Sequence, residues 1–194
     1  MNARMNFWKI AFFSLAGLVA ASLVGLILLI GGTTTSPPLP ESDATQTEGY
    51  TLELNTTKEN FEGIANTYIR KAVKGSLPVE LEMRDDVLLT SELTVFSYTL
   101  PLAMHFDPVV QEDGNLILKQ SSMELGHLTI PPSTVLKLLK NSVELPSWMV
   151  VRAKEEEIFI NLQDLPISGD VQVKAKEVNL AENDIILEVL IPKN

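Results

Sequence analysis

The pattern of apolar residues divides the chain into one unbroken apolar run and a long region of alternating character. The run, Ile10–Ile30, has no charged residue among its 21 positions. At about 1.5 Å per residue a helix of this length spans roughly 30 Å, the thickness of a bilayer's hydrocarbon core. A cleaved signal peptide is the alternative, but its apolar region normally covers about 7–15 residues. The run therefore predicts a retained transmembrane helix over residues 10–30.

The residues that flank the run predict its orientation. Arg4 and Lys9 precede it, and no acidic residue occurs before Glu41. By the positive-inside rule, residues 1–9 form a cytoplasmic tail and the rest of the chain lies outside the cell. Residues 31–49 are rich in Gly, Thr and Pro without an apolar period, which is typical of a flexible linker with a reach of roughly 25 Å. We expect a single-pass cell-membrane protein with an extracellular domain over residues 50–194.

Within that domain, two segments have apolar residues at helical spacing, and the other segments have apolar residues at about every second position. Residues 57–74 carry apolar side chains at helical spacing, and residues 133–141 form a shorter segment of the same kind. Alternation predicts strands at 50–54, 79–84, 87–99, 100–106, 116–120, 123–130, 148–153, 157–162, 171–175 and 184–191. Hairpin-length connections favour antiparallel pairing. The predicted class is α+β: a curved antiparallel sheet packed with one long amphipathic helix and one short helix.

The amino-acid composition limits the environments and the partners that suit the predicted extracellular domain. The 194-residue chain has no cysteine, so the exported domain must fold without disulfides. All 25 acidic residues and 13 of the 15 basic ones follow the apolar run, so this part carries about −12 at neutral pH. That charge argues against a nucleic-acid partner, and its simplest role is to keep the domain in solution.

Motifs for catalysis are not found in the sequence. Neither histidine lies near a Cys, a second His or paired acidic residues at metal-ligand spacing. His105 and Asp107 could point to one face of a strand, but a strand-end His followed by a turn Asp is the more common arrangement. We therefore predict no catalytic residue, no metal and no cofactor, and we expect that the protein is not an enzyme.

Several short stretches, in this order and spacing, resemble the YpmS-like family of bacterial membrane-anchored proteins, a domain of unknown function. They are the apolar run, the helical segment Thr57–Lys74 that leads into Leu77–Val79, and then Phe96–Leu102, Asp113–Leu118, Met123–Pro131, Leu145–Trp148 and Val178–Pro192. The resemblance implies a Gram-positive source, which would place the domain between membrane and cell wall. It supplies no catalytic residues.

A looser likeness at the level of fold suggests a ligand. An amphipathic helix along a curved antiparallel sheet resembles the tubular lipid-binding (TULIP-like) proteins, which hold lipid between helix and sheet. We therefore expect a lipid-binding groove between residues 57–74 and 100–106. Its predicted lipid-binding residues are Phe61, Ile64, Tyr68 and Ile69 on the helix, facing Leu102, Met104 and Phe106 on the sheet. The alternative is a protein–protein docking module for an envelope enzyme or assembly factor.

Overall fold

The computed structural model describes residues 14–15, 17–22, 37–39, 49–72, 78–95, 98–127, 130–142, 144–167 and 171–193. The chain divides into two compact units, Met1–Thr35 and Ser36–Asn194. In the first unit, residues 14–15 and 17–22 are helical. Among the described residues, no helix is both long and apolar enough to cross a membrane. The cytoplasmic tail and most of the predicted transmembrane helix and linker lie outside the described residues.

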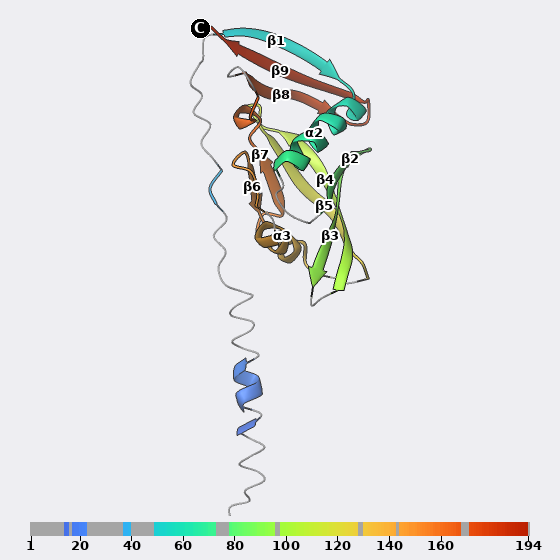
Figure 1. The fold of residues 1–194 in the computed structure, drawn as a ribbon, viewed down its shortest axis with the longest axis vertical. Coiled ribbons are helices and arrows are strands. Elements are labelled where there is room, and N and C mark those ends of the chain that lie inside the picture. The colour runs from blue at the N-terminus through green and yellow to red at the C-terminus, as the bar shows by residue number, and fades with distance from the viewer. Residues whose placement is uncertain are drawn as a thin grey trace, which may run out of the picture. The chain divides into compact units, whose positions relative to one another are not determined.

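The second unit is an α+β domain with antiparallel strands, as the apolar pattern predicts (Figure 1). Its two helices are α2 (Lys58–Ala72) and α3 (Pro132–Ser142), and a short 3₁₀ helix, η1, covers Leu162–Asp164. The strands are β1 (Gly49–Thr56), β2 (Val79–Met83), β3 (Val87–Val95), β4 (Tyr98–Val110), β5 (Leu116–Leu125), β6 (Met149–Arg152), β7 (Glu157–Ile160), β8 (Gln172–Asn179) and β9 (Asp184–Pro192).

The strands form two sheets where the sequence predicts one. Their orders are β1-β9-β8 and β2-β3-β4-β5-β7-β6. The sheets meet where the Ala175 N–H donates to the Gly114 carbonyl, at 2.7 Å, in the turn between β4 and β5. Gly114 has a φ of +85°, and a Cβ there would lie 2.5 Å from the Lys174 Cβ. A glycine is therefore required at the point where β8 approaches this turn.

Strand β5 is continuous where the sequence predicts a break. Leu116 and Leu118 lie on its inward face, and so do Met123 and Leu125, although Met123 is five positions after Leu118 and would face the other way in a regular strand. A bulge solves this conflict, because the register against β4 shifts between His105 and Phe106. One extra residue returns the later side chains to the same face of the sheet.

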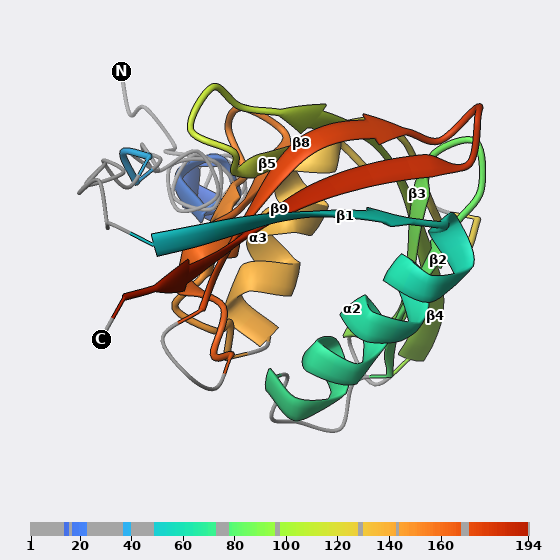
Figure 2. The same ribbon diagram turned by 90° about the horizontal axis from the view of Figure 1, so that it is seen from above.

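The six-stranded sheet curls around α3, and α2 lies beside the edge strand β2 (Figure 2). Helix α3 packs against β5 and β6, and its Val135 and Leu136 are fully buried. Leu138, which the helical pattern assigns to the same apolar side, is 37% exposed. The inward side chains of α3 belong to one core cluster with Met104 and Phe106 of β4.

Candidate functional site

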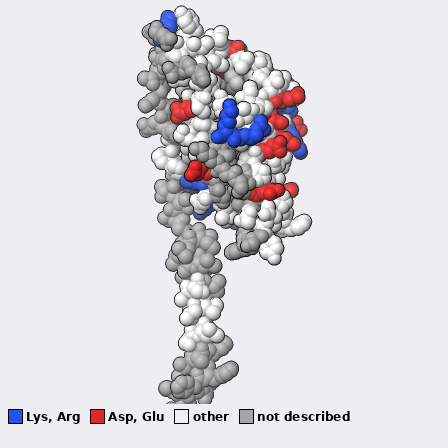
Figure 3. Space-filling model, viewed as in Figure 1, with Lys and Arg blue, Asp and Glu red and all other residues white. Residues whose placement is uncertain are grey.

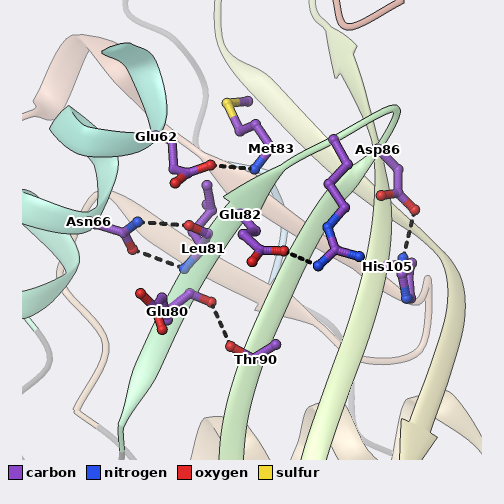
Figure 4. A network of polar contacts seen from close by, with 10 residues as sticks. Glu62, Asn66, Glu80, Leu81, Glu82, Met83, Asp86, Thr90 and His105 are labelled. Atoms are coloured by element: carbon purple, nitrogen blue, oxygen red, sulfur yellow. Dashed lines mark hydrogen bonds and ion pairs between the residues drawn. The ribbon is translucent and has the colours of Figure 1, made fainter. Parts of the chain in front are cut away.

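Helix α2 is fixed to the edge of the six-stranded sheet by its polar side chains (Figure 4). The buried Asn66 donates from Nδ2 to the Leu81 carbonyl at 2.7 Å and accepts from the Leu81 N–H at 2.9 Å. Glu62 accepts from the Met83 N–H at 2.8 Å. These groups take the place of a neighbouring strand and satisfy backbone groups at the free edge of β2.

The N-terminal end of α2 is held by two turns that are distant in sequence. The Lys58 N–H donates to Asn183 Oδ1 in the β8–β9 turn at 2.9 Å, and Lys58 Nζ donates to the Arg84 carbonyl at 2.9 Å. Asn183 has a φ of +56°, a conformation that asparagine tolerates better than most residues. With one side of the helix fixed in this way, its apolar side faces the interior.

A cavity of about 270 Å³ lies among α2, the inner face of the six-stranded sheet and the three-stranded sheet. Twenty-five residues line it, and all of them are aliphatic or aromatic, or are Met or Pro. Register explains why one sheet face is so uniform: Leu118 pairs with both Pro108 and Ile158, and Leu116 pairs with Ile160. Paired residues in an antiparallel sheet project from the same face. The strands thus present an unbroken apolar wall.

The four predicted residues of α2 all line this cavity, although they differ in burial. Ile69 is 7% exposed, and Phe61 and Tyr68 are half-buried. Ile64 is 52% exposed, so the expectation that the whole face would be buried is wrong for this residue. Leu54 of β1 also lines the cavity and is 48% exposed. Two half-exposed lining residues, one on each element, mark an opening to solvent between β1 and α2.

The predicted sheet residues lie elsewhere. Leu102, Met104 and Phe106 are at most 2% exposed, but they do not line the cavity. The lining residues of this sheet come from β2, β3, β5, β6 and β7, and from β4 only at Pro108. Helix α2 lies beside β2 at the edge of the sheet. Leu102, Met104 and Phe106 of β4 therefore face the core and not the cavity. Leu102 borders a separate depression of about 390 Å³, where Glu80, Glu92 and Glu124 also lie.

Sequence reasoning missed the polar contacts that position the helix. The helical pattern alone places Glu62 on the solvent side of α2 and gives Asn66 no role. The spacing of Glu62 and Asn66 could have predicted that they act together, because residues four apart on a helix lie on one side of it. Asn66 also interrupts the apolar face between Ala65 and Ile69. A polar residue inside an apolar face indicates a buried hydrogen-bonding partner.

The charged groups of the domain lie away from the cavity wall. On the face in Figure 3, acidic side chains gather on the side of β2 and β3, and basic side chains lie nearer the middle. His105 Nδ1 lies 2.7 Å from Asp86 Oδ2, so its partner is in the β2–β3 turn and is not Asp107 (Figure 4). Among the described residues, no group of three His, Cys, Asp or Glu side chains could hold a metal ion.

The comparisons with known proteins concern nearly the whole chain. Residues 6–191 match a family described as an uncharacterized protein conserved in bacteria, DUF2140. The chain belongs to this family. It is 31% identical over 192 residues to the uncharacterized protein YpmS of Bacillus subtilis (strain 168), covering 97% of this chain and 100% of that one. The YpmS-like resemblance is thus confirmed, and the DUF2140 match contains every residue that lines the cavity. No solved structure matches the chain.

Proposed function

We propose that this protein is a membrane-anchored, non-catalytic protein whose extracellular domain binds the hydrocarbon chain of a lipid in the cavity beside α2. The observation that carries the proposal is the wall of the cavity, in which all 25 lining residues are apolar or aromatic. Among the described lining side chains, only the Tyr68 hydroxyl and the Trp148 indole N–H are strong hydrogen-bonding groups. The buried part of a ligand should therefore be hydrocarbon, with its polar group left at the opening.

The size of the cavity supports occupancy by a single chain. Small-molecule sites usually measure about 300–1,000 Å³, so about 270 Å³ suits one chain better than a lipid with two. A hydrocarbon chain in the cavity would make dispersion contacts with the apolar wall and would remove that wall from water.

The docking-module alternative predicts a different interior. A domain that only binds a protein partner needs an exposed patch and can have a filled core throughout. The inward residues Val135 and Leu136 of α3 are completely buried and do not line the cavity, whereas the inward residues of α2 do line it. This difference is why we favour a lipid ligand.

The membrane location follows from the apolar run and its flanking charges, and it has a direct test. We propose a single-pass topology with a cytoplasmic N-terminus and residues 50–194 outside. The chain has no cysteine, so Ser42→Cys creates a unique labelling site. A membrane-impermeant thiol reagent should label it on intact cells. Labelling that appears only after lysis would contradict this topology, and mature protein that begins near Thr33 would show a cleaved signal.

Lipid occupancy can be measured by native mass spectrometry of the full chain released from detergent micelles. The wild-type protein should carry a single-chain or acyl-chain adduct that survives gentle activation. Ala65→Trp should remove the adduct, because Ala65 lines the cavity and the indole ring would occupy its space. Thr67→Trp is the matched control, since Thr67 lies on the same helix, is exposed and does not line the cavity.

Two outcomes would contradict the proposal. One is a wild-type protein without any lipid adduct, together with an Ala65→Trp variant that is destabilised by about 1–3 kcal/mol, as expected for overpacking of a filled core. The other is an adduct that both tryptophan variants retain equally, because the lipid would then lie outside the cavity. Near-UV circular dichroism of each variant shows whether the fold is retained.

A further inference from the structure

A row of exposed apolar side chains leads from the cavity along strand β1. Leu54, which lines the cavity, is 48% exposed, Leu52 is 57% exposed and Tyr50 is 63% exposed. Alternate residues of a strand share one face, so these three side chains form a line. Their exposure rises steadily with distance from the cavity. Large apolar residues exposed in a row, and not singly, indicate an interaction surface.

The neighbouring strand continues the same surface. Leu54 pairs with Leu187, Leu52 with Val189 and Tyr50 with Ile191. Leu187 and Val189 line the cavity, whereas Ile191 does not line it and is 38% exposed. The inner face of the β1–β9 pair is therefore one apolar surface, which borders the cavity at one end and is more exposed at the other.

The opposite face of β1 carries the polar side chains Thr51, Glu53 and Asn55, so the apolar row belongs to one face of this strand. Glu53 lies between Leu52 and Leu54, and its carboxylate pairs with Lys176 at 2.5 Å. The hydrogen bond from Lys176 to Glu53 raises the pKa of that lysine. One face of β1 thus interacts with water and counter-charges, and the other offers hydrocarbon contact to something outside the domain.

We propose that this row, from Tyr50 and Ile191 to Leu54, is the path by which the acyl chain of a membrane lipid enters and leaves the cavity. The inference rests on the proposed lipid-binding function and adds the route and the source of the ligand. Strand β1 is at the edge of its sheet, so a chain can reach the row from the side.

The position of the row in the sequence identifies the membrane as the source. Tyr50 follows the end of the apolar run at Ile30 by only 20 residues. A connecting segment of that length keeps the start of β1 within roughly 25 Å of the run on average. At this open end, Lys193 Nζ lies 5.5 Å from the centre of the Tyr50 ring. An amphipathic aromatic ring beside a basic group suits the headgroup region of a bilayer.

The test uses Trp148, a buried cavity-lining residue, as a reporter of chain entry. The chain has two tryptophans, so the full-length protein is prepared with Trp8→Phe and reconstituted in phosphatidylcholine vesicles. A single-chain phospholipid with a brominated acyl chain is then added, and quenching of Trp148 fluorescence is followed with time. The final extent of quenching measures occupancy of the cavity, and the rate measures entry.

Leu52→Gln should slow quenching about tenfold and leave its final extent unchanged, because Leu52 lies on the row but does not line the cavity. Thr51→Gln is the control on the outer face of the same strand and should quench at the wild-type rate. Ile191→Gln, on the neighbouring strand of the row, should also slow the quenching of Trp148. Because this change is on β9, the same result in both variants would show that the slowing does not come from a folding defect in β1.

The outcomes separate the two proposals. Wild-type quenching rates in both Leu52→Gln and Ile191→Gln, with normal final extents, would overturn the entry path and leave cavity binding intact; the row would then be a surface for a protein partner. The absence of quenching in the parent protein would instead overturn lipid binding itself.

Discussion

The two helices of the domain have similar sequence patterns but different surroundings. Both are amphipathic and both turn their apolar side inward. The inward residues of α3, Val135 and Leu136, are completely buried in a filled core. Those of α2 border an apolar cavity, and Ile64 is 52% exposed at its opening. An apolar helical face therefore shows that a helix needs an apolar partner, but not whether that partner is protein or a ligand.

The two helices also differ in how they are held. Burial of side chains holds α3 against β5 and β6. Helix α2, whose Ile64 is exposed, is also held by the hydrogen bonds of Asn66 and Glu62 with β2 and by Asn183, which accepts from the Lys58 N–H at its N-terminus. Such polar contacts can fix a helix at a distance from a sheet without filling the space beneath it. We infer that they are what keeps the cavity open.

The largest effect should come from placing a carboxylate on each helix in turn. Leu136→Asp buries an ionisable group without a partner and should cost roughly 4 kcal/mol or more in the free energy of unfolding. Ile64→Asp should cost less than half as much, because its carboxylate can reach water at the opening. Thermal unfolding of the full chain in detergent, followed by near-UV circular dichroism, provides the measurement.

The Ile64→Asp result also tests the corrected burial of Ile64. From the sequence alone, Ile64→Asp is expected to cost several kcal/mol, since Ile64 lies in the middle of the apolar face. Equal melting temperatures for Leu136→Asp and Ile64→Asp would mean that both helices cover filled core, and the contrast between them would be lost.

A smaller effect should follow from removing the polar contacts of α2. Asn66→Ala leaves the N–H and carbonyl of Leu81 without their partner and should cost about 2–3 kcal/mol. Thr67→Ala is the control, because the Thr67 hydroxyl donates to the Gly63 carbonyl and accepts from Arg70 Nη2, both within the same helix. We expect it to change stability by less than about 0.5 kcal/mol. Similar losses for the two variants would show that the β2 contacts do not hold the helix.

Local patterns made much of the fold predictable. The period of apolar residues identified both helices and nearly every strand, because each element has one apolar side and one polar side. It could not identify the division into two sheets, since alternation in β8 and β9 is the same whichever strand they pair with. The pairing of β9 with β1 joins segments at opposite ends of the domain, and single-strand patterns contain no information on such contacts.

The candidate site was predictable only on the helix side. Phe61, Ile64, Tyr68 and Ile69 share one face, so a single helical pattern assigns them together. Their partners depend on where α2 crosses the sheet, and this is decided by Asn66 and Glu62 at the edge of β2. Met104 and Phe106 have the same alternating pattern as the cavity-lining strand residues, so alternation could not separate filled core from cavity wall.

The smallest effect, and the sharpest contrast between the two regions, should come from the same enlargement made in each. Val151 on β6 is 1% exposed and does not line the cavity, whereas Val178 on β8 does. Val151→Phe should destabilise the domain by about 1–3 kcal/mol, because a filled core must distort to accept the ring. Val178→Phe should cost less than about 1 kcal/mol and should lower lipid occupancy in native mass spectrometry, because its ring extends into space that a ligand would otherwise take. If Val178→Phe destabilises as much as Val151→Phe and leaves lipid occupancy unchanged, the region beside α2 is packed like the region beside α3 and the lipid lies elsewhere.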